Sequence, residues 1–310
     1  MSDYISNLQW SELAYYLIDG FCNGSIFALI ALGYTMVYGI IKLINFAHGE
    51  FFMVGAYAGF GAWLLLFEHL PLLLIIPIVL LVSGLAGSTI AISTERIAYK
   101  PIRNSSRLIA LLTAIGVSLV LQNLFKFVNK GQKLKFTGEF ADLANHKVLI
   151  AGQNIPTIKF FFVITVIVLM LLLWYLVMKT AFGRAMRATS QDLDAARLMG
   201  INVDRIILYT FAIGGFFAGI AGILQGLIYT IQPMMGFTPG IIAFVAAVVG
   251  GIGSIPGAVL GGILIGVLQN TILWLGVPGS YKDVCVYILL VIILVFRPQG
   301  ILGKAEIEKV

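Results

Sequence analysis

The sequence predicts an all-α fold, a polytopic transmembrane helix bundle with broken helices, forming one domain over residues 1–310. The chain is 60% hydrophobic and 11% charged, and its mean hydropathy is +1.00. Several apolar runs reach the roughly 20 residues that a helix needs to cross a bilayer. Polar residues gather between those runs, as expected when a charge at the bilayer centre costs several kcal/mol. We therefore expect a membrane protein and not a water-soluble enzyme.

Nine apolar runs are candidates for membrane-spanning helices. They cover residues 13–41, 47–67, 71–93, 108–128, 158–178, 207–231, 239–252, 257–276 and 281–296. If every run crosses, all eight arginines lie in segments on one side, which the positive-inside rule assigns to the cytoplasm. The N-terminus then lies outside and the C-terminus in the cytoplasm. The formal net charge of +6 is interpreted as a topology signal and not as a nucleic-acid-binding patch.

The connection at residues 129–157 is expected on the exterior side. It carries four lysines, and basic residues favour the cytoplasmic side, so they argue against an exterior position. Glu139 and Asp142 dilute this positive charge. Alternating apolar residues at 146–150, followed by Asn154-Ile155-Pro156, fit a small hairpin over the exterior mouth. A solvated connection fits this loop equally well.

The apolar pattern is interrupted within residues 33–57, GYTMVYGIIKLINFAHGEFFMVGAY, at Asn45, His48 and Glu50. Such a break can bring a helix N-terminus into the bundle, where it meets an anionic group of a solute. We therefore take Asn45, His48 and Glu50 as candidates for a translocation path. The alternative is structural, with Asn45 as helix cap and Glu50 in the first turn. A zinc site is disfavoured because only two ligands lie near each other.

A second interruption falls at residues 232–239, QPMMGFTP, which adds Gln232 to the candidate path residues. The helix entering this break is expected to run outwards, whereas the helix entering the first break runs inwards. Paired breaks in oppositely oriented halves are typical of an inverted repeat around a shared pathway. We treat the inverted repeat as a hypothesis. Isolated polar residues in other spans, such as Gln122, serve either helix packing or a solute path.

The polar segment at residues 179–206, here called the coupling loop, holds four of the eight arginines. Asp194, Ala195 and Ala196 followed by Gly200 predict a short helix that ends at the glycine. This acid-Ala-Ala-x-x-x-Gly pattern resembles the cytoplasmic loop through which ABC importer permeases contact their ATPases. An ordinary amphipathic loop helix is the alternative interpretation.

Four motifs together resemble the LivH-type permeases of branched-chain amino acid ABC importers. They are the first break at 33–57, FGRAMRATSQDLDAARLMGI at 182–201, AAVVGGIGSIPGAVLGG at 246–262 and FRPQGILG at 296–303. The resemblance implies a bacterial inner (plasma) membrane protein that pairs with a second, LivM-type permease. It further implies two ATP-binding subunits and an extracytoplasmic amino-acid-binding protein that delivers leucine, isoleucine or valine.

The resemblance assigns coupling to the ATPase to four residues, Asp194, Ala195, Ala196 and Gly200. The wider importer pattern usually has glutamate at the first of these positions, so Asp194 is one methylene shorter. The sequence holds no Walker-type motif and no Ser-His-Asp or metal constellation, so we expect no enzyme activity, no cofactor and no metal in this chain. Two alternatives are an ABC permease for urea or other small amides, and an ion-coupled secondary amino acid carrier that uses Asp19 or Glu50.

Overall fold

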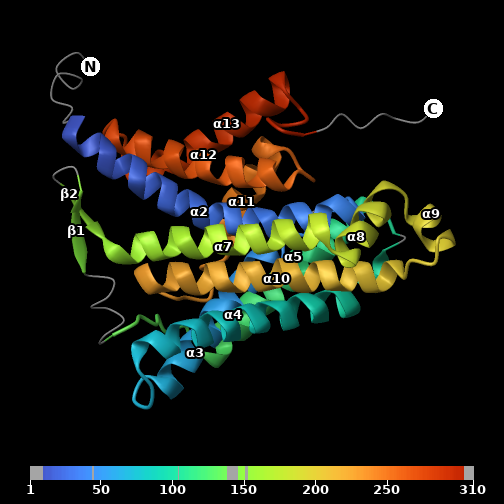
Figure 1. Cartoon of the computed structure of the whole chain (residues 1–310), viewed down its shortest axis with the longest axis horizontal. Helices are drawn as coiled ribbons and strands as arrows, with labels where there is room; N and C mark the ends of the chain where they lie inside the picture. Colours follow the sequence, from blue (N-terminus) through green and yellow to red (C-terminus); the bar gives the residue numbers. More distant parts are fainter. Residues whose placement is uncertain (1–9, 44, 104, 138–145, 151–152, 304–310) are drawn as a thin grey trace.

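The computed structural model describes residues 10–43, 45–103, 105–137, 146–150 and 153–303, and helices dominate these ranges (Figure 1). Eight segments in them are long and apolar enough to cross a membrane. Their helices are α2 (Trp10–Ile41), α3 (His48–Leu66), α4 (Leu72–Thr94), α5 (Arg107–Val128), α7 (Thr157–Lys179), α10 (Val203–Ile228), α12 (Ile255–Trp274) and α13 (Lys282–Phe296). The prediction of an all-α, polytopic bundle is confirmed.

Shorter elements connect these helices. They are the π-helical turn η1 (Glu95–Tyr99), the 3₁₀ turns η2 (Lys100–Ile102) and η3 (Gly279–Tyr281), and the helices α8 (Ala181–Gln191), α9 (Leu193–Leu198) and α11 (Phe237–Gly250). The strands β1 (Lys147–Ile150) and β2 (Gln153–Pro156) pair antiparallel, with Lys147 opposite Pro156. The connection at 129–157 therefore contains the hairpin, and its residues 138–145 and 151–152 lie outside the described ranges.

The run at residues 239–252 differs from the other eight, because it forms only the short helix α11. Its 14 residues span about 21 Å at 1.5 Å per residue, whereas the hydrocarbon core is about 30 Å thick. Gly236, the residue before α11, packs against Gly49 inside the bundle, and Gly251 ends the helix with a φ of 109°. The described chain thus has eight candidate spans. The ninth predicted crossing combines the short helix α11 with the segment before it, in which Ile231 pairs with Leu134 of the 129–157 connection.

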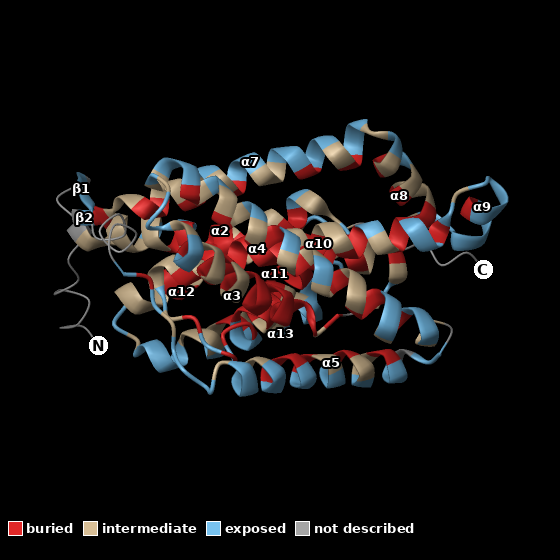
Figure 2. Cartoon of the chain, turned by 90° about the horizontal axis from the view of Figure 1, so that it is seen from below, coloured by how far each residue is buried: buried red, intermediate tan, exposed pale blue. Residues whose placement is uncertain are grey.

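Close contacts between small residues hold the centre of the bundle together. Figure 2 shows the buried residues concentrated around α2, α10 and α11, with α5 and α7 along opposite edges. On α2, Gly24 lies against Gly266 of α12, and a Cβ on Gly266 would overlap the Gly24 backbone. Small residues allow such backbone approach in lipid, where dispersion and not water exclusion drives helix association.

The two ends of the bundle carry different elements. The β1–β2 hairpin and the start of α2 lie at one end, and α8 with α9 at the opposite end (Figure 1). At the α8–α9 end, the N–H of Ile301 donates to the carbonyl of Val249 at 2.9 Å, and that of Leu302 to Gly250 at 2.9 Å. The segment after α13 is therefore bonded to the last turn of α11.

Candidate functional site

The two interruptions predicted from the sequence meet in the interior. A Cβ on Gly49, in the first turn of α3, would overlap the carbonyl of Gly236 and crowd the Cα of Gly240. Neither the residue before α3 nor the residue before α11 provides a side-chain cap. The N-terminal ends of α3 and α11 therefore abut within the bundle, and we call this contact the junction.

Asn45 and Tyr99 connect the junction to the end of α4. Asn45 is 2% exposed, and its Oδ1 accepts hydrogen bonds from the Ala47 N–H at 3.0 Å and the Tyr99 hydroxyl at 2.9 Å. Ala47 and not Asn45 stands at the N-cap of α3. Asn45 therefore acts as an Asx turn two residues earlier, which modifies the capping interpretation.

Glu50 and His48 are also buried at the start of α3, each 1% exposed. Glu50 Oε1 accepts from the Ser118 hydroxyl at 2.9 Å and from Gln122 Nε2 at 2.7 Å, both on α5. The His48 ring packs against Tyr34, with centroids 4.6 Å apart. Among the described residues, no group of three or more His, Cys, Asp or Glu side chains is placed to hold a metal ion.

A pocket of about 560 Å³ lies beside the junction. Its polar lining comes from Tyr34, Ser118 and Gln122, and its apolar lining from α5, α11 and the two breaks; these apolar residues are Phe46, Leu111, Ile115, Leu119, Met234, Gly236, Phe237, Gly240 and Ile241. The exposed Gln232 lies in the turn before α11 and outside this lining. The structure therefore brings Asn45, His48 and Glu50 together beside the junction and leaves Gln232 apart from them.

Ser118 and Gln122 are the site residues that sequence reasoning did not assign. Gln122 stands out as a polar residue in a span, but its target does not follow from the sequence. The feature of the sequence that could have pointed to the pair is their spacing of four residues, which places both side chains on one face of α5. That this face meets Glu50, about 70 positions earlier, depends on tertiary packing.

The coupling loop forms α8 and α9, and α9 projects beyond the bundle (Figure 1). Asp192 caps α9, because its Oδ1 accepts from the N–H groups of Asp194 at 2.9 Å and Ala195 at 3.0 Å. Gly200 follows α9 with a φ of 79°, a conformation that favours glycine. The predicted helix with its glycine stop is thus present.

The side chains of the predicted coupling residues have different exposures. Asp194 is 87% exposed and pairs with Arg197 at 3.0 Å, Ala195 is exposed, and Ala196 is buried. Leu198 and Met199 are 88% and 82% exposed. The tip of the loop therefore presents one acid and two large apolar side chains, which is unusual for a surface with no partner.

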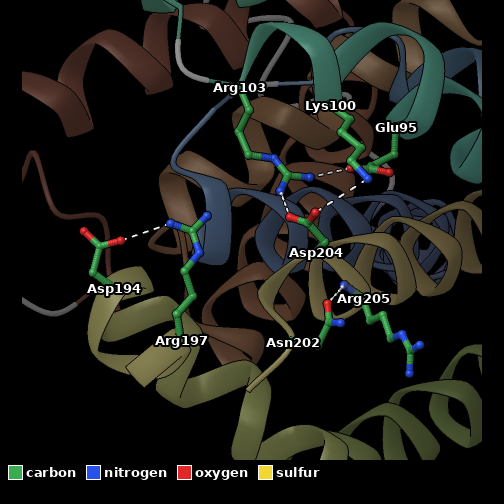
Figure 3. Close-up of polar contacts among 8 residues, drawn as sticks. All are labelled: Glu95, Lys100, Arg103, Asp194, Arg197, Asn202, Asp204 and Arg205. Carbon is green, nitrogen blue, oxygen red and sulfur yellow. Dashed lines mark hydrogen bonds and ion pairs between the residues drawn. The ribbon is translucent and has the colours of Figure 1, made fainter. Parts of the chain in front are cut away.

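A cluster of ion pairs lies where α10 leaves the coupling loop (Figure 3). Asn202 caps α10 by accepting from the Arg205 N–H at 3.1 Å. Arg103 donates to Asp204 at 2.6 Å and to the buried Glu95 at 2.5 Å, and Lys100 lies 3.5 Å from Asp204. The cluster joins α10 to the end of α4.

Comparisons with known proteins identify the family. Residues 16–294 match the family described as "Branched-chain amino acid transport system / permease component". The chain is 43% identical over 306 residues to the "High-affinity branched-chain amino acid transport system permease protein BraD" of Pseudomonas aeruginosa, covering 95% of this chain and 97% of that protein. It is 42% identical over 305 residues to the corresponding LivH protein of Salmonella typhimurium, covering 95% and 96%.

A solved structure, "PsaBC from Streptococcus pneumoniae in complex with Fab", is 17% identical with a TM-score of 0.42, covering 96% of each chain. This likeness is too weak to add to the assignment. The family match and the two relatives confirm the resemblance to LivH-type permeases that the four sequence motifs indicate. The chain therefore belongs to the branched-chain amino acid transport system permease family.

Proposed function

We propose that the chain is the permease subunit of an ATP-driven ABC importer for leucine, isoleucine and valine. The observation that carries this proposal is the 40–43% identity, over 95% of the chain, to permeases named for high-affinity branched-chain amino acid transport. Eight apolar spans fit a protein of the bacterial inner membrane. The N-terminus lies outside and α9 and the C-terminus face the cytoplasm, in accordance with the positions of the arginines.

The translocation path passes the junction, with Asn45, His48 and Glu50 beside it and Gln232 nearer its exterior mouth. Two helix starts in the interior support this placement, because oriented N–H groups favour an anionic group such as the carboxylate of an amino acid. The apolar lining of the adjacent pocket suits an aliphatic side chain. The chain forms this path together with a second, LivM-type permease.

ATP energy enters from two separate ATP-binding subunits through the coupling loop. Asp194, Ala195, Ala196 and Gly200 form the contact, and the exposed apolar tip of α9 supplies surface for it. An extracytoplasmic amino-acid-binding protein delivers the solute at the hairpin end. The loop then carries the motion of the ATPase into α8 and α10, which flank it.

The test is reconstitution of the chain with the second permease, the ATP-binding subunits and the binding protein in liposomes. ATP should drive uptake of radiolabelled leucine, isoleucine and valine but not of urea. Uptake by the chain alone, driven by a proton or sodium gradient without ATPase subunits, would overturn the proposal. Membrane-impermeant maleimide applied from outside should label a cysteine placed at Leu149 in β1 but not one placed at Leu198, and the reverse pattern would overturn the orientation.

A further inference from the structure

The Glu50 carboxylate is buried in the bundle with no cation beside it in the described part of the chain. It is 1% exposed, and it takes part in none of the ion pairs found among the described residues. Oε1 accepts two hydrogen bonds, but Oε2 has no partner within those residues. A buried carboxylate requires hydrogen bonds and a counter-charge to be stable in its ionised form.

The donor and acceptor roles of Ser118 and Gln122 are fixed by their hydrogen bonds to Glu50. Both residues act as donors toward Glu50 Oε1, and Gln122 Nε2 also donates to Ser118 Oγ at 3.2 Å. A hydroxyl has one proton, so the Ser118 oxygen can only accept further hydrogen bonds, and the amide oxygen of Gln122 is also an acceptor. Since both residues line the pocket, this end of the pocket offers acceptor atoms backed by a carboxylate.

The other walls of the pocket are apolar, apart from Tyr34 and the start of α11. Leu111, Ile115 and Leu119 contribute aliphatic side chains from α5, and Phe237 and Ile241 contribute from α11. Gly236, the uncapped N-cap of α11, is part of the lining as well, and the positive end of a helix dipole favours an anion. The pocket thus combines an acceptor-rich acidic end, an apolar wall and a helix start.

We propose that Glu50, Ser118 and Gln122 form the subsite for the ammonium group of an aliphatic amino acid in transit. An ammonium group has three donors and no acceptor, which matches the acceptor atoms of Ser118 and Gln122 and the charge of Glu50. The carboxylate of the same solute lies toward the start of α11, and its branched side chain lies on the apolar wall. This subsite rests on the proposed function for the solute class, and it selects zwitterionic amino acids over neutral amides.

The test uses the assembled transporter. In this chain Cys22 and Cys285 are replaced by alanine so that they do not react with maleimide, and Ile115→Cys places a reporter thiol on the pocket wall. We expect L-leucine to slow maleimide labelling of the reporter, whereas 4-methylpentanoate, which lacks the ammonium group, should not. Glu50→Gln keeps the shape and an acceptor for Ser118 but removes the charge. It should abolish protection by leucine and lower leucine uptake about tenfold or more, as expected for losing a hydrogen bond to a charged group.

Asp283→Asn is the matched control, because Asp283 Oδ1 also accepts from a glutamine, Gln269, at 2.8 Å, away from the pocket lining. It should leave protection and uptake unchanged. Ser118→Ala provides a second variant if Glu50→Gln does not assemble, and it should raise the leucine concentration needed for protection several-fold. Full protection in Glu50→Gln would overturn the subsite while wild-type leucine uptake still supported the proposed function. If only Ser118→Ala assembles, protection at the wild-type leucine concentration would overturn it.

Discussion

Arg103 and Asp204 join the segment after α4 to the first turn of α10 through a hydrogen bond of 2.6 Å (Figure 3). The same guanidinium binds Glu95 in the π-helical turn η1, and Tyr99 at the end of that turn donates to Asn45 beside the junction. A continuous set of contacts therefore leads from the base of the coupling loop to the start of α3. Short π-helical segments are frequent at functional sites.

Asp204→Asn should weaken the transmission of motion from the coupling loop to the junction. Asp204 is 50% exposed, so the lost ion pairs should cost less than about 1 kcal/mol of stability. Uptake of leucine per ATP hydrolysed in the assembled importer should fall about threefold to tenfold, the range expected for a residue that modulates coupling. Basal ATP hydrolysis should stay close to the wild-type rate.

Arg205→Gln is the control for that experiment, because the Arg205 side chain points away from the cluster (Figure 3). It should leave the uptake-to-hydrolysis ratio unchanged. A double variant of Arg103→Gln and Asp204→Asn should lose less than the sum of the single losses, since the two residues act through one contact. Additive losses would show that Arg103 and Asp204 act independently.

Gly200 should tolerate asparagine but not valine. Its φ of 79° lies in the left-handed region, which asparagine adopts at modest cost and a β-branched residue does not. No atom lies within 4 Å of a Cβ built there, so the effect comes from backbone strain and not from a clash. ATP-driven leucine uptake should be near normal in Gly200→Asn and strongly reduced in Gly200→Val. Equal uptake by the two variants would show that transport does not depend on the left-handed backbone conformation that follows α9.

Leu198→Asp should weaken binding of the ATP-binding subunits. The side chain is 88% exposed at the tip of α9, and a buried charge would be costly in a formed interface. A tagged chain purified in mild detergent should recover much less ATPase subunit than wild type. Leu149→Asp is the control, because Leu149 is 69% exposed in β1 at the opposite end of the bundle. This variant should recover as much ATPase subunit as wild type. If Leu198→Asp also recovers the wild-type amount, α9 does not contact the ATPase.

Gly55→Ala should destabilise the bundle, whereas Gly61→Ala on the same helix should not. A Cβ on Gly55 would overlap the backbone of Gly219 in α10, and a Cβ on Gly61 has no neighbour within 4 Å. Overpacking of this kind costs about 1–3 kcal/mol. A thermal melt of the purified transporter should show a lower midpoint for Gly55→Ala alone, and matching midpoints would argue against the observed approach of α3 to α10.

Composition and apolar run length were sufficient to predict the helical membrane fold, and polar interruptions were sufficient to locate both breaks. The apolar run at 239–252 already has the 14-residue length of α11, but the start of this helix inside the bundle was not predictable, because it depends on Gly236 meeting Gly49 from another part of the chain. The same limit applies to Glu50, whose partners Ser118 and Gln122 depend on how α5 packs. Gln232 lies apart from the buried residues Asn45, His48 and Glu50. In the turn before α11, the first residue that lines the pocket is Met234, two positions after Gln232.

The backbone hydrogen bonds from Ile301 and Leu302 to the last turn of α11 have a mechanical consequence. α11 is anchored at its start by Gly49 and at its end by the segment that follows α13, so it cannot slide along its axis without breaking one of these attachments. α5, which lies at the edge of the bundle (Figure 2), is held to the start of α3 by the side-chain hydrogen bonds from Ser118 and Gln122 to Glu50 and has no backbone attachment of this kind among the described contacts. We therefore expect the pocket to widen by movement of α5, which breaks side-chain hydrogen bonds only, with α11 as the stationary wall.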